Sequence, residues 1–435
     1  MMFYKESHFK ETNIGNIPED WEAKQLNEIT ERKKFSIVDG PFGTQLHSNE
    51  YVDQGVPLIR VNDIKRDGSF GFDELVYITE EKFEKLNRSA VYPGDILLAK
   101  TGATIGKVCI FPANLERGLI ASSCAKISID NLKADNRYVF YFLLSAIGYA
   151  QILALATGAT RPTINLTPIG KIRVLLPKNI AEQRKIVEVL SVVDLAIRKV
   201  DEVIAKTERL KKGLMQELLT KGIGHKEFKD TKIGKIPKTW EVEEIKNLGE
   251  LQYGYTTSAR NENTGTKFLR VTDIKDDGRI KWDAIPYCHI DKKDYRKYAL
   301  EEEDILFARI GATAGKTGFI DRKTKGIFAS YLIRLKINKG NVLPKFVFYF
   351  TQSSAYWLRA LREREGQLKK GINATMLSKF QVPVPPVPEQ QKIAEIISAV
   401  DQKLELERHE KVKLENIKRG LMDLLLTGKI RVKVD

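Results

Sequence analysis

The chain has 435 residues, and its 42% hydrophobic and 9% aromatic content is typical of folded globular domains and excludes a largely disordered protein. Lys and Arg outnumber Asp and Glu by 72 to 57, and the resulting net charge of +15 favours a polyanionic partner, nucleic acid ahead of a membrane surface. Three widely separated cysteines (Cys109, Cys124, Cys288) and five scattered histidines predict neither disulfides nor a metal site. Charge alone leaves open a basic surface without a dedicated partner.

The N-terminal segment, MMFYKESHFKE, lacks the apolar core of a signal peptide. The most apolar window, residues 140–158, is interrupted by Ser145, Gln151 and Thr157, which favours a buried helix over a membrane span. A cytoplasmic protein without membrane contact is therefore expected.

Most of the chain is an internal repeat. Residues 9–22 (FKETNIGNIPEDWE) recur at 228–241 (FKDTKIGKIPKTWE), and residues 95–107 (DILLAKTGATIGK) recur at 304–316 (DILFARIGATAGK). Further pairs are LIRVNDIK and FLRVTDIK, RYVFYFLLS and KFVFYFTQS, AEQRKI and PEQQKI, and KKGLMQELLTKG and KRGLMDLLLTGK. Similarity of this extent predicts two copies of one structural unit.

The first part of each copy has the pattern of an α+β domain. Short apolar runs such as VPLIRV and DILLAK are bounded by turn sequences such as RDG and PGD, which predicts strands. We therefore expect one globular domain over residues 1–179 and a second, similar one over residues 224–387.

A long helix is expected after each domain, over residues 180–223 and 388–435. Apolar residues recur there at steps of four and three, which predicts two antiparallel helices packed as a coiled coil. The predicted seam residues are Ile186, Leu190, Val193, Ile197, Ile393, Ile397, Val400 and Leu404. Acidic and basic residues nearly balance in both segments, so the positive surplus, and with it a nucleic-acid surface, is expected on the globular domains.

The segment GATAGKT at residues 311–317 resembles a phosphate-binding loop but is one residue too short for it. The residues that follow predict a strand, whereas a phosphate-binding loop leads into a helix. A tight glycine turn is expected instead, with Lys107 and Lys316 at its tip as candidate phosphate contacts. The two copies share no catalytic set, so the sequence predicts a binding protein and not an enzyme.

Residues that recognise different DNA sequences should lie where the two copies differ. Residues 38–54 differ from 253–266, and residues 158–163 differ from 366–371; all four segments carry side chains that can contact base edges or phosphates. The candidate DNA contacts in them are Thr44, Gln45, His47, Ser48, Asn49, Arg161, Tyr253, Tyr255, Thr256, Ser258, Arg260, Lys369 and Lys370. Ordinary solvent exposure is the alternative for each of them.

Two motifs identify a family resemblance. FQVPVPPVPEQQKI at residues 380–393, and more loosely IRVLLPKNIAEQRKI at 172–186, lead into helices that end in K-x-G-L-M-x-x-L-L-T. This arrangement, repeated in tandem, resembles the specificity subunit of type I restriction-modification systems. The first copy departs from the motif by having Leu176 and Asn179 where prolines are usual.

The resemblance implies a non-catalytic subunit in which each domain recognises one half of an interrupted, asymmetric double-stranded DNA target. The helices would set the gap and dock two modification subunits, which use S-adenosylmethionine to methylate adenines. ATP and Mg would belong to restriction subunits, whose presence the sequence leaves open. A stand-alone two-domain DNA-binding regulator and a coiled-coil scaffold for protein partners are the alternatives.

Overall fold

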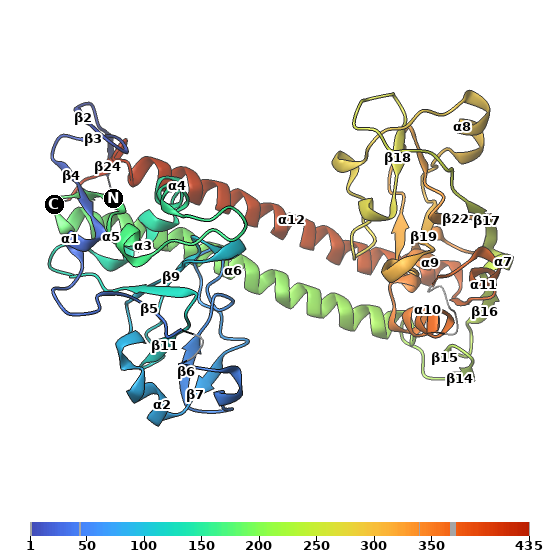
Figure 1. Cartoon of the computed structure of the whole chain (residues 1–435). Coiled ribbons are helices and arrows are strands. Elements are labelled where there is room, and N and C mark those ends of the chain that lie inside the picture. The colour runs from blue at the N-terminus through green and yellow to red at the C-terminus, as the bar shows by residue number, and fades with distance from the viewer. Residues whose placement is uncertain (1, 43–44, 339, 366–370, 435) are drawn as a thin grey trace. The chain divides into compact units, whose positions relative to one another are not determined.

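The computed structural model describes residues 2–42, 45–338, 340–365 and 371–434. It divides into two compact units, Met1–Asp201 with Glu410–Asp435 (unit 1) and Glu202–His409 (unit 2). Each unit holds one globular domain together with part of two long helices, α6 (Ile180–Leu218) and α12 (Val387–Leu425) (Figure 1).

The domain in unit 1 is built on two sheets. The first has the order β10-β9-β12-β5 with antiparallel neighbours, and the second has the order β7-β6-β11-β8, in which β6 and β11 are parallel. Their strands are β5 (Ile37–Asp39), β6 (Val56–Ile59), β7 (Val76–Ile78), β8 (Ala90–Val91), β9 (Ile96–Ala99), β10 (Val108–Ile110), β11 (Gly118–Ile120) and β12 (Cys124–Ile127). The apolar runs VPLI and ILLA are buried at every position because β6 and β9 are central strands.

The most apolar segment of unit 1 forms two helices where one buried helix was expected: α3 (Asn136–Leu144) is mostly buried, whereas α4 (Ala146–Leu155) buries only Gly148 and Ile152. The break falls at Ser145, whose side-chain oxygen accepts a hydrogen bond from the Gly148 N–H and thereby caps α4. In the described part of the chain, no single helix is long and apolar enough to span a membrane. The helices α3 and α4, which meet at a bend of 73°, reach that length and apolar content only when they are taken together. The remaining helices are α1 (Leu26–Ile29), α2 (Glu80–Lys85) and α5 (Leu166–Gly170).

Shorter strand pairs complete unit 1. A hairpin joins β2 (Phe9–Thr12) to β3 (Gly15–Pro18), and β4 (Trp21–Gln25) pairs with β13 (Arg173–Pro177), the strand that leads into α6. The pairing of β4 with β13 places the buried Trp21 ring in the same core as Ile186 and Leu190 of α6.

Unit 2 repeats this plan. Its main sheet has the order β17-β22-β19-β20, β18 and β21 are parallel like β6 and β11, and β16 pairs with β23 as β4 does with β13. The strands are β14 (Phe228–Thr231), β15 (Gly234–Pro237), β16 (Glu241–Glu244), β17 (Gly249–Tyr253), β18 (Lys267–Leu269), β19 (Ile305–Ala308), β20 (Thr317–Phe319), β21 (Gly326–Phe328), β22 (Leu332–Ile337) and β23 (Gln381–Val384). The helices are α7 (Ile245–Leu248), α8 (Lys292–Tyr298), α9 (Pro344–Thr351), α10 (Ser354–Glu365) and α11 (Ala374–Ser378).

The helices α6 and α12 run antiparallel and are joined by ion pairs within each unit. In unit 1, Asp194 of α6 pairs with Lys418 of α12 at 2.6 Å. In unit 2, Lys211 of α6 pairs with Asp401 of α12, also at 2.6 Å. In unit 1 the acid lies on α6 and the base on α12, whereas in unit 2 the acid lies on α12 and the base on α6. This exchange follows from the internal repeat, because α6 and α12 are equivalent helices of the two copies.

A tyrosine ties each domain to the helix pair at the same ion pair. Tyr141 of α3 donates a hydrogen bond to Asp194 at 2.6 Å, and Tyr349 of α9 donates one to Asp401 at 3.0 Å. Burial raises the pKa of both tyrosines, so both remain neutral hydrogen-bond donors. The domains are thereby anchored to both long helices through equivalent contacts.

The predicted seam residues lie mostly in the interior. Ile186 and Leu190 belong to the core of unit 1 together with Leu425 of α12, and Ile393 and Ile397 belong to the core of unit 2. The other predicted seam residues are Leu404, which is buried, and Val193, Ile197 and Val400, which are partly buried. The ends of the helix pair are therefore continuous with the domain cores.

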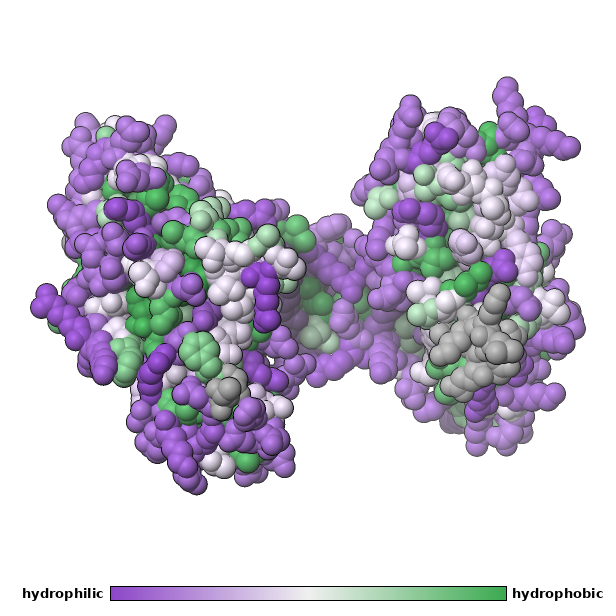
Figure 2. All heavy atoms as spheres, in the orientation of Figure 1, coloured by the Kyte–Doolittle hydropathy of each residue, from purple (hydrophilic) through white to green (hydrophobic). Residues whose placement is uncertain are grey.

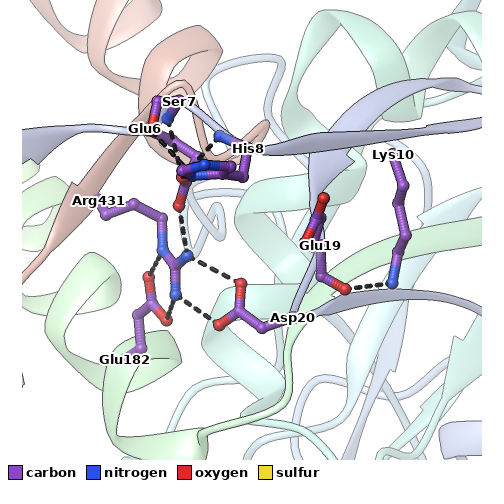
Figure 3. Close-up of polar contacts among 8 residues, drawn as sticks. All are labelled: Glu6, Ser7, His8, Lys10, Glu19, Asp20, Glu182 and Arg431. Carbon is purple, nitrogen blue, oxygen red and sulfur yellow. Dashed lines mark hydrogen bonds and ion pairs between the residues drawn. The ribbon is translucent and has the colours of Figure 1, made fainter.

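The two ends of the chain meet in unit 1. β24 (Ile430–Val432) pairs antiparallel with β1 (Phe3–Lys5), and Arg431 turns its side chain toward the carboxylates of Glu6, Asp20 and Glu182 (Figure 3). Arg431 donates to Glu182 at 2.6 and 2.8 Å, to Asp20 at 2.8 and 2.9 Å, and to Glu6 at 2.8 Å. Arg431 is only 7% exposed and Glu182 is buried, so the contact between them is shielded from water, whereas Asp20 lies at the surface.

The expected fold class is confirmed: a tandem α+β repeat of two domains joined by two long antiparallel helices. The second long helix is shorter than the expected 388–435. It ends at Leu425, and Gly428 then adopts a positive φ of 71° that directs the chain into β24.

Candidate nucleic-acid interface

Four segments converge at one end of the main sheet in unit 1. They are residues 39–42 after β5, 100–104 after β9, 121–123 after β11 and 157–163 after α4, and we call them loop cluster 1. Backbone hydrogen bonds run from Gly40 N to Cys124 O at 3.4 Å, from Lys100 N to Ser123 O at 2.9 Å and from Gly102 N to Pro162 O at 2.8 Å. The cluster therefore brings together two of the segments predicted to contact DNA.

The corresponding segments of unit 2 form loop cluster 2. It comprises residues 253–255 after β17, 309–313 after β19, 329–331 after β21 and 371–373 before α11. Its backbone hydrogen bonds run from Tyr255 N to Phe328 O at 2.9 Å, from Arg309 N to Tyr331 O at 3.0 Å and from Ile372 N to Arg309 O at 2.8 Å. Both domains thus present the same loop scaffold.

A close backbone approach fixes the first loop in both clusters. A Cβ atom added to Gly40 would lie 2.2 Å from the carbonyl oxygen of Ile120, and one added to Gly254 would lie 2.2 Å from that of Ala329. Because no side chain fits there, glycine is required for the loop to cross the neighbouring strand end.

The predicted contacts of the first domain are mainly exposed. Gln45, His47, Ser48 and Asn49 lie on the surface beyond loop cluster 1, and Thr44 lies outside the described residues. Arg161 is exposed within the cluster, beside Gly102, whereas Lys107 is partly buried at the base of the glycine turn. The turn joins the antiparallel strands β9 and β10, as expected, and no helix follows it.

In the second domain, Tyr253, Thr256, Ser258 and Arg260 are exposed, and Lys369 and Lys370 lie outside the described residues. Tyr255 is partly buried and packs on Tyr298, with ring centroids 5.2 Å apart. The Lys316 ammonium forms an ion pair with the Asp276 carboxylate at 2.8 Å. Lys316 is therefore less suited to contact a phosphate than its place in the sequence indicates.

The structure adds two residues, Arg309 and Tyr331, that the sequence comparison did not name as DNA contacts. Arg309 lies in the repeated DIL-A-[KR]-x-GAT motif, yet its guanidinium stacks over the Tyr253 ring at 4.8 Å within loop cluster 2. Tyr331 is 59% exposed and follows the strand β21 that supports the cluster. The change from Lys100 to Arg309, and from Ser123 to Tyr331, is the signal that could have identified both.

The described side chains form no group of three or more His, Cys, Asp or Glu residues suited to hold a metal ion. The three cysteines are free and buried. Burial raises the pKa of the Cys124 thiol to about 12, so this thiol stays protonated at neutral pH.

A family model described as "Type I restriction modification DNA specificity domain" matches residues 18–208 and, a second time, residues 237–416. The chain belongs to this family. The two matches coincide with the two copies of the repeat, so each copy is one DNA specificity domain.

Similar proteins carry related names. The chain is 31% identical to the "Putative type I restriction enzyme MjaX specificity subunit" of Methanocaldococcus jannaschii, over 100% of this chain and 99% of the relative. It is 27% identical to the MjaVIII specificity subunit of the same organism, over 100% and 98%. The solved type I restriction-modification S subunit of M. genitalium has a TM-score of 0.57 at 15% identity, covering 98% of this chain and 99% of that one, which supports the specificity-domain fold.

Proposed function

We propose that the protein is the DNA-specificity subunit of a type I restriction-modification complex, in which each domain recognises one half of a bipartite, asymmetric target. The observation that carries the proposal is the equivalence of the two loop clusters. They share their backbone scaffold but carry different side chains: Phe42 and Arg161 are exposed in one, and Tyr253 and Tyr331 are exposed beside the partly buried Arg309 in the other. Equal scaffolds with unequal side chains suit two domains that recognise different bases.

The long helices are the proposed docking surface for modification subunits. Most of the face visible in Figure 2 is hydrophilic, yet the helices carry single apolar side chains that are exposed to solvent. These are Val192, Leu195, Leu210, Leu406, Val412 and Ile417. Leu210 and Ile417 each lie directly before the KxGLM motif, at equivalent positions of the two copies, which supports two equivalent docking sites.

The same helices are proposed to set the gap between the two half-sites. Each contains 39 residues, and at 1.5 Å per residue such a helix is roughly 60 Å long. The chain supplies recognition and no chemistry: S-adenosylmethionine would be bound by the methyltransferase subunits, and ATP and Mg by restriction subunits where these are present.

The proposal is tested by reconstituting the chain with a candidate type I methyltransferase subunit and mapping the methylated adenines on genomic DNA. We expect methylation within one bipartite motif. Replacing residues 38–54 by the corresponding segment of a relative should change one half of that motif and leave the other half intact. A change in both halves, or in neither, would contradict the assignment of one domain to one half.

The two alternatives give different results. A stand-alone regulator would bind a specific site tightly without any partner subunit. A protein scaffold would show no steep dependence of DNA binding on salt, because it would neutralise no phosphates.

A further inference from the structure

The loop clusters surround one pair of equivalent cations, Lys100 and Arg309, with different side chains. Both residues follow the DIL-A strand (β9 or β19), and both are held by a backbone hydrogen bond to the neighbouring loop, at 2.9 Å from Lys100 N and 3.0 Å from Arg309 N. The same backbone position therefore presents a different cation in each domain.

In loop cluster 1 this cation is neutralised. Lys100 is 7% exposed and donates to Asp39 at 3.0 Å, and Arg88 donates to the second oxygen of the same carboxylate at 2.9 Å. Asp39 lies at the end of β5, so the strand that opens the cluster also supplies the counter-charge. Lys100 consequently stabilises the fold and is not available to DNA.

In loop cluster 2 the counter-charge is missing. The residue at the end of β17 is Tyr253, and the Arg309 guanidinium lies 4.8 Å from the centre of its ring. No carboxylate lies within 4 Å of Arg309 in the described part of the chain. One guanidinium nitrogen, Nη1, donates to Ser330 O at 3.3 Å, and the described residues supply no acceptor for Nε or Nη2.

The aromatic support is itself held in place. The Tyr253 hydroxyl accepts a hydrogen bond from the Ala374 N–H at 2.9 Å, at the first turn of α11. The Tyr253 ring is thus held by the backbone of α11, and the Arg309 guanidinium is held by the carbonyl oxygen of Ser330. Such pre-organisation lowers the entropy that an arginine loses when it engages a ligand.

The surroundings favour a base over a phosphate. Ile310 and Tyr331 flank Arg309 and are 46% and 59% exposed, so the cation sits among apolar and aromatic surfaces. A planar guanidinium with free donors matches the O6 and N7 acceptors of guanine in the major groove, and this bidentate pair is the commonest specific contact to DNA.

We propose that Arg309, stacked on Tyr253, is a specificity-determining residue of the second domain and recognises a guanine in its half-site. This inference rests on the proposed function, because it assumes that loop cluster 2 faces the DNA target. Lys100 has no such role, so the first domain recognises its half-site without a cation at this position.

The test uses the reconstituted complex with R309K and R309Q variants, and methylation of a library in which every base of the target is varied. We expect both variants to lose discrimination at one G·C pair of a single half-site. The loss should be on the order of 10- to 100-fold, as for removal of one bidentate base contact. The half-site of the first domain should remain unchanged.

An unfolding measurement and one further variant separate recognition from folding. R309K is compatible with the turn because lysine occupies the same place in loop cluster 1, and the thermal unfolding midpoint of R309K should confirm this. R322K is the matched control, since Arg322 also stacks on an aromatic ring, Trp282 at 5.3 Å, but is paired with Asp321. R322K should leave the recognised motif unchanged.

Three results would overturn the proposal. An unaltered motif in both Arg309 variants would exclude a base contact while leaving the proposed function intact. Weaker methylation at all sequences, with a salt dependence reduced by about one phosphate contact, would identify a backbone contact instead. A wild-type complex that methylates no bipartite motif would remove the proposed function and this inference together.

Discussion

The cluster around Arg431 shows how a single residue joins the last strand to the first domain. Its guanidinium is shared among Glu6, Asp20 and Glu182, and Glu182 is itself buried at the start of α6. In unit 2 the residue equivalent to Glu182 is Glu389, which accepts hydrogen bonds from Trp240 Nε1 and the Ile223 N–H. The same carboxylate position therefore secures the end of a long helix in both copies, with different donors.

Replacing Arg431 by alanine should destabilise unit 1 strongly. Loss of the guanidinium leaves three carboxylates close together with no counter-charge, at a cost of about 3 kcal/mol or more. The free energy of unfolding in urea measures the effect. The control is R322A, which removes an exposed ion pair and should cost less than about 1 kcal/mol; similar losses in both variants would contradict the role assigned to Arg431.

The cysteines should not react with iodoacetamide in the folded protein. Cys109, Cys124 and Cys288 are all buried, and burial raises the pKa of each thiol, which suppresses the reactive thiolate. Mass spectrometry after alkylation at pH 8 should find no labelled cysteine without denaturant. In about 8 M urea, which unfolds most proteins, it should find three. Rapid labelling of the native protein would show that one of these sites opens readily.

At the residue scale the sequence predicted part of the candidate site. Comparing the two copies located the variable loops, because loops that differ between copies of one fold are free of packing constraints. It could not identify Arg309, since Lys and Arg at that position are chemically similar and only their surroundings, Asp39 or Tyr253, distinguish them. It also could not predict that Lys316 is engaged by Asp276, a residue from a distant turn.

At the scale of elements, the repeated heptad-like spacing predicted the long helices well, and their ends less well. The end of α12 was placed too late because the turn at Gly428 and the pairing of β24 with β1 depend on contacts with the other end of the chain. The break between α3 and α4 was missed for a local reason: Ser145 is compatible with a helix interior, but here its side chain caps a new helix.

Replacing a side chain by alanine should have different effects on the free energy of unfolding at the two faces of α6. Leu190 is fully buried in the core of unit 1, whereas Val192, two residues later, is 64% exposed. L190A should lower the free energy of unfolding by about 2 to 5 kcal/mol, and V192A should change it by less than about 0.5 kcal/mol. Urea unfolding of both variants checks this, and equal effects would show that α6 is rotated from the orientation described.

The exposed face of the helices should instead matter for assembly. Leu210 and Ile417 are 56% and 43% exposed, so L210D with I417D should change the free energy of unfolding only a little. If modification subunits dock there, the double variant should co-purify with fewer of them, and L210D or I417D alone should lose one docking site each. Wild-type stoichiometry in the double variant would place docking elsewhere.

At the scale of the whole molecule, the tandem repeat was the strongest signal in the sequence. It predicted two copies of one structural unit, whereas the apolar runs between turns predicted the α+β class and the apolar spacing predicted the antiparallel helices. The charge, by contrast, indicated only a polyanionic partner.

The affinity of the isolated chain for DNA should fall steeply with salt. If 6 to 10 phosphates are neutralised, about a 10³- to 10⁵-fold loss of affinity is expected between 50 and 200 mM salt. Fluorescence anisotropy with labelled duplexes measures it, and a flat response would argue against an extended DNA contact.

The pairing of β24 with β1 also bears on the order in which the chain matures during synthesis. Unit 2 is made from one continuous stretch, Glu202–His409, whereas unit 1 needs Met1–Asp201 together with Glu410–Asp435. Met422, Leu425, Leu426 and Val432 belong to the core of unit 1, and the ribosome delivers them after the whole of unit 2. Domains usually complete in the order in which they emerge. Here the first domain must wait, incompletely packed, until residues 410–435 leave the exit tunnel, after the second domain has received all of its own.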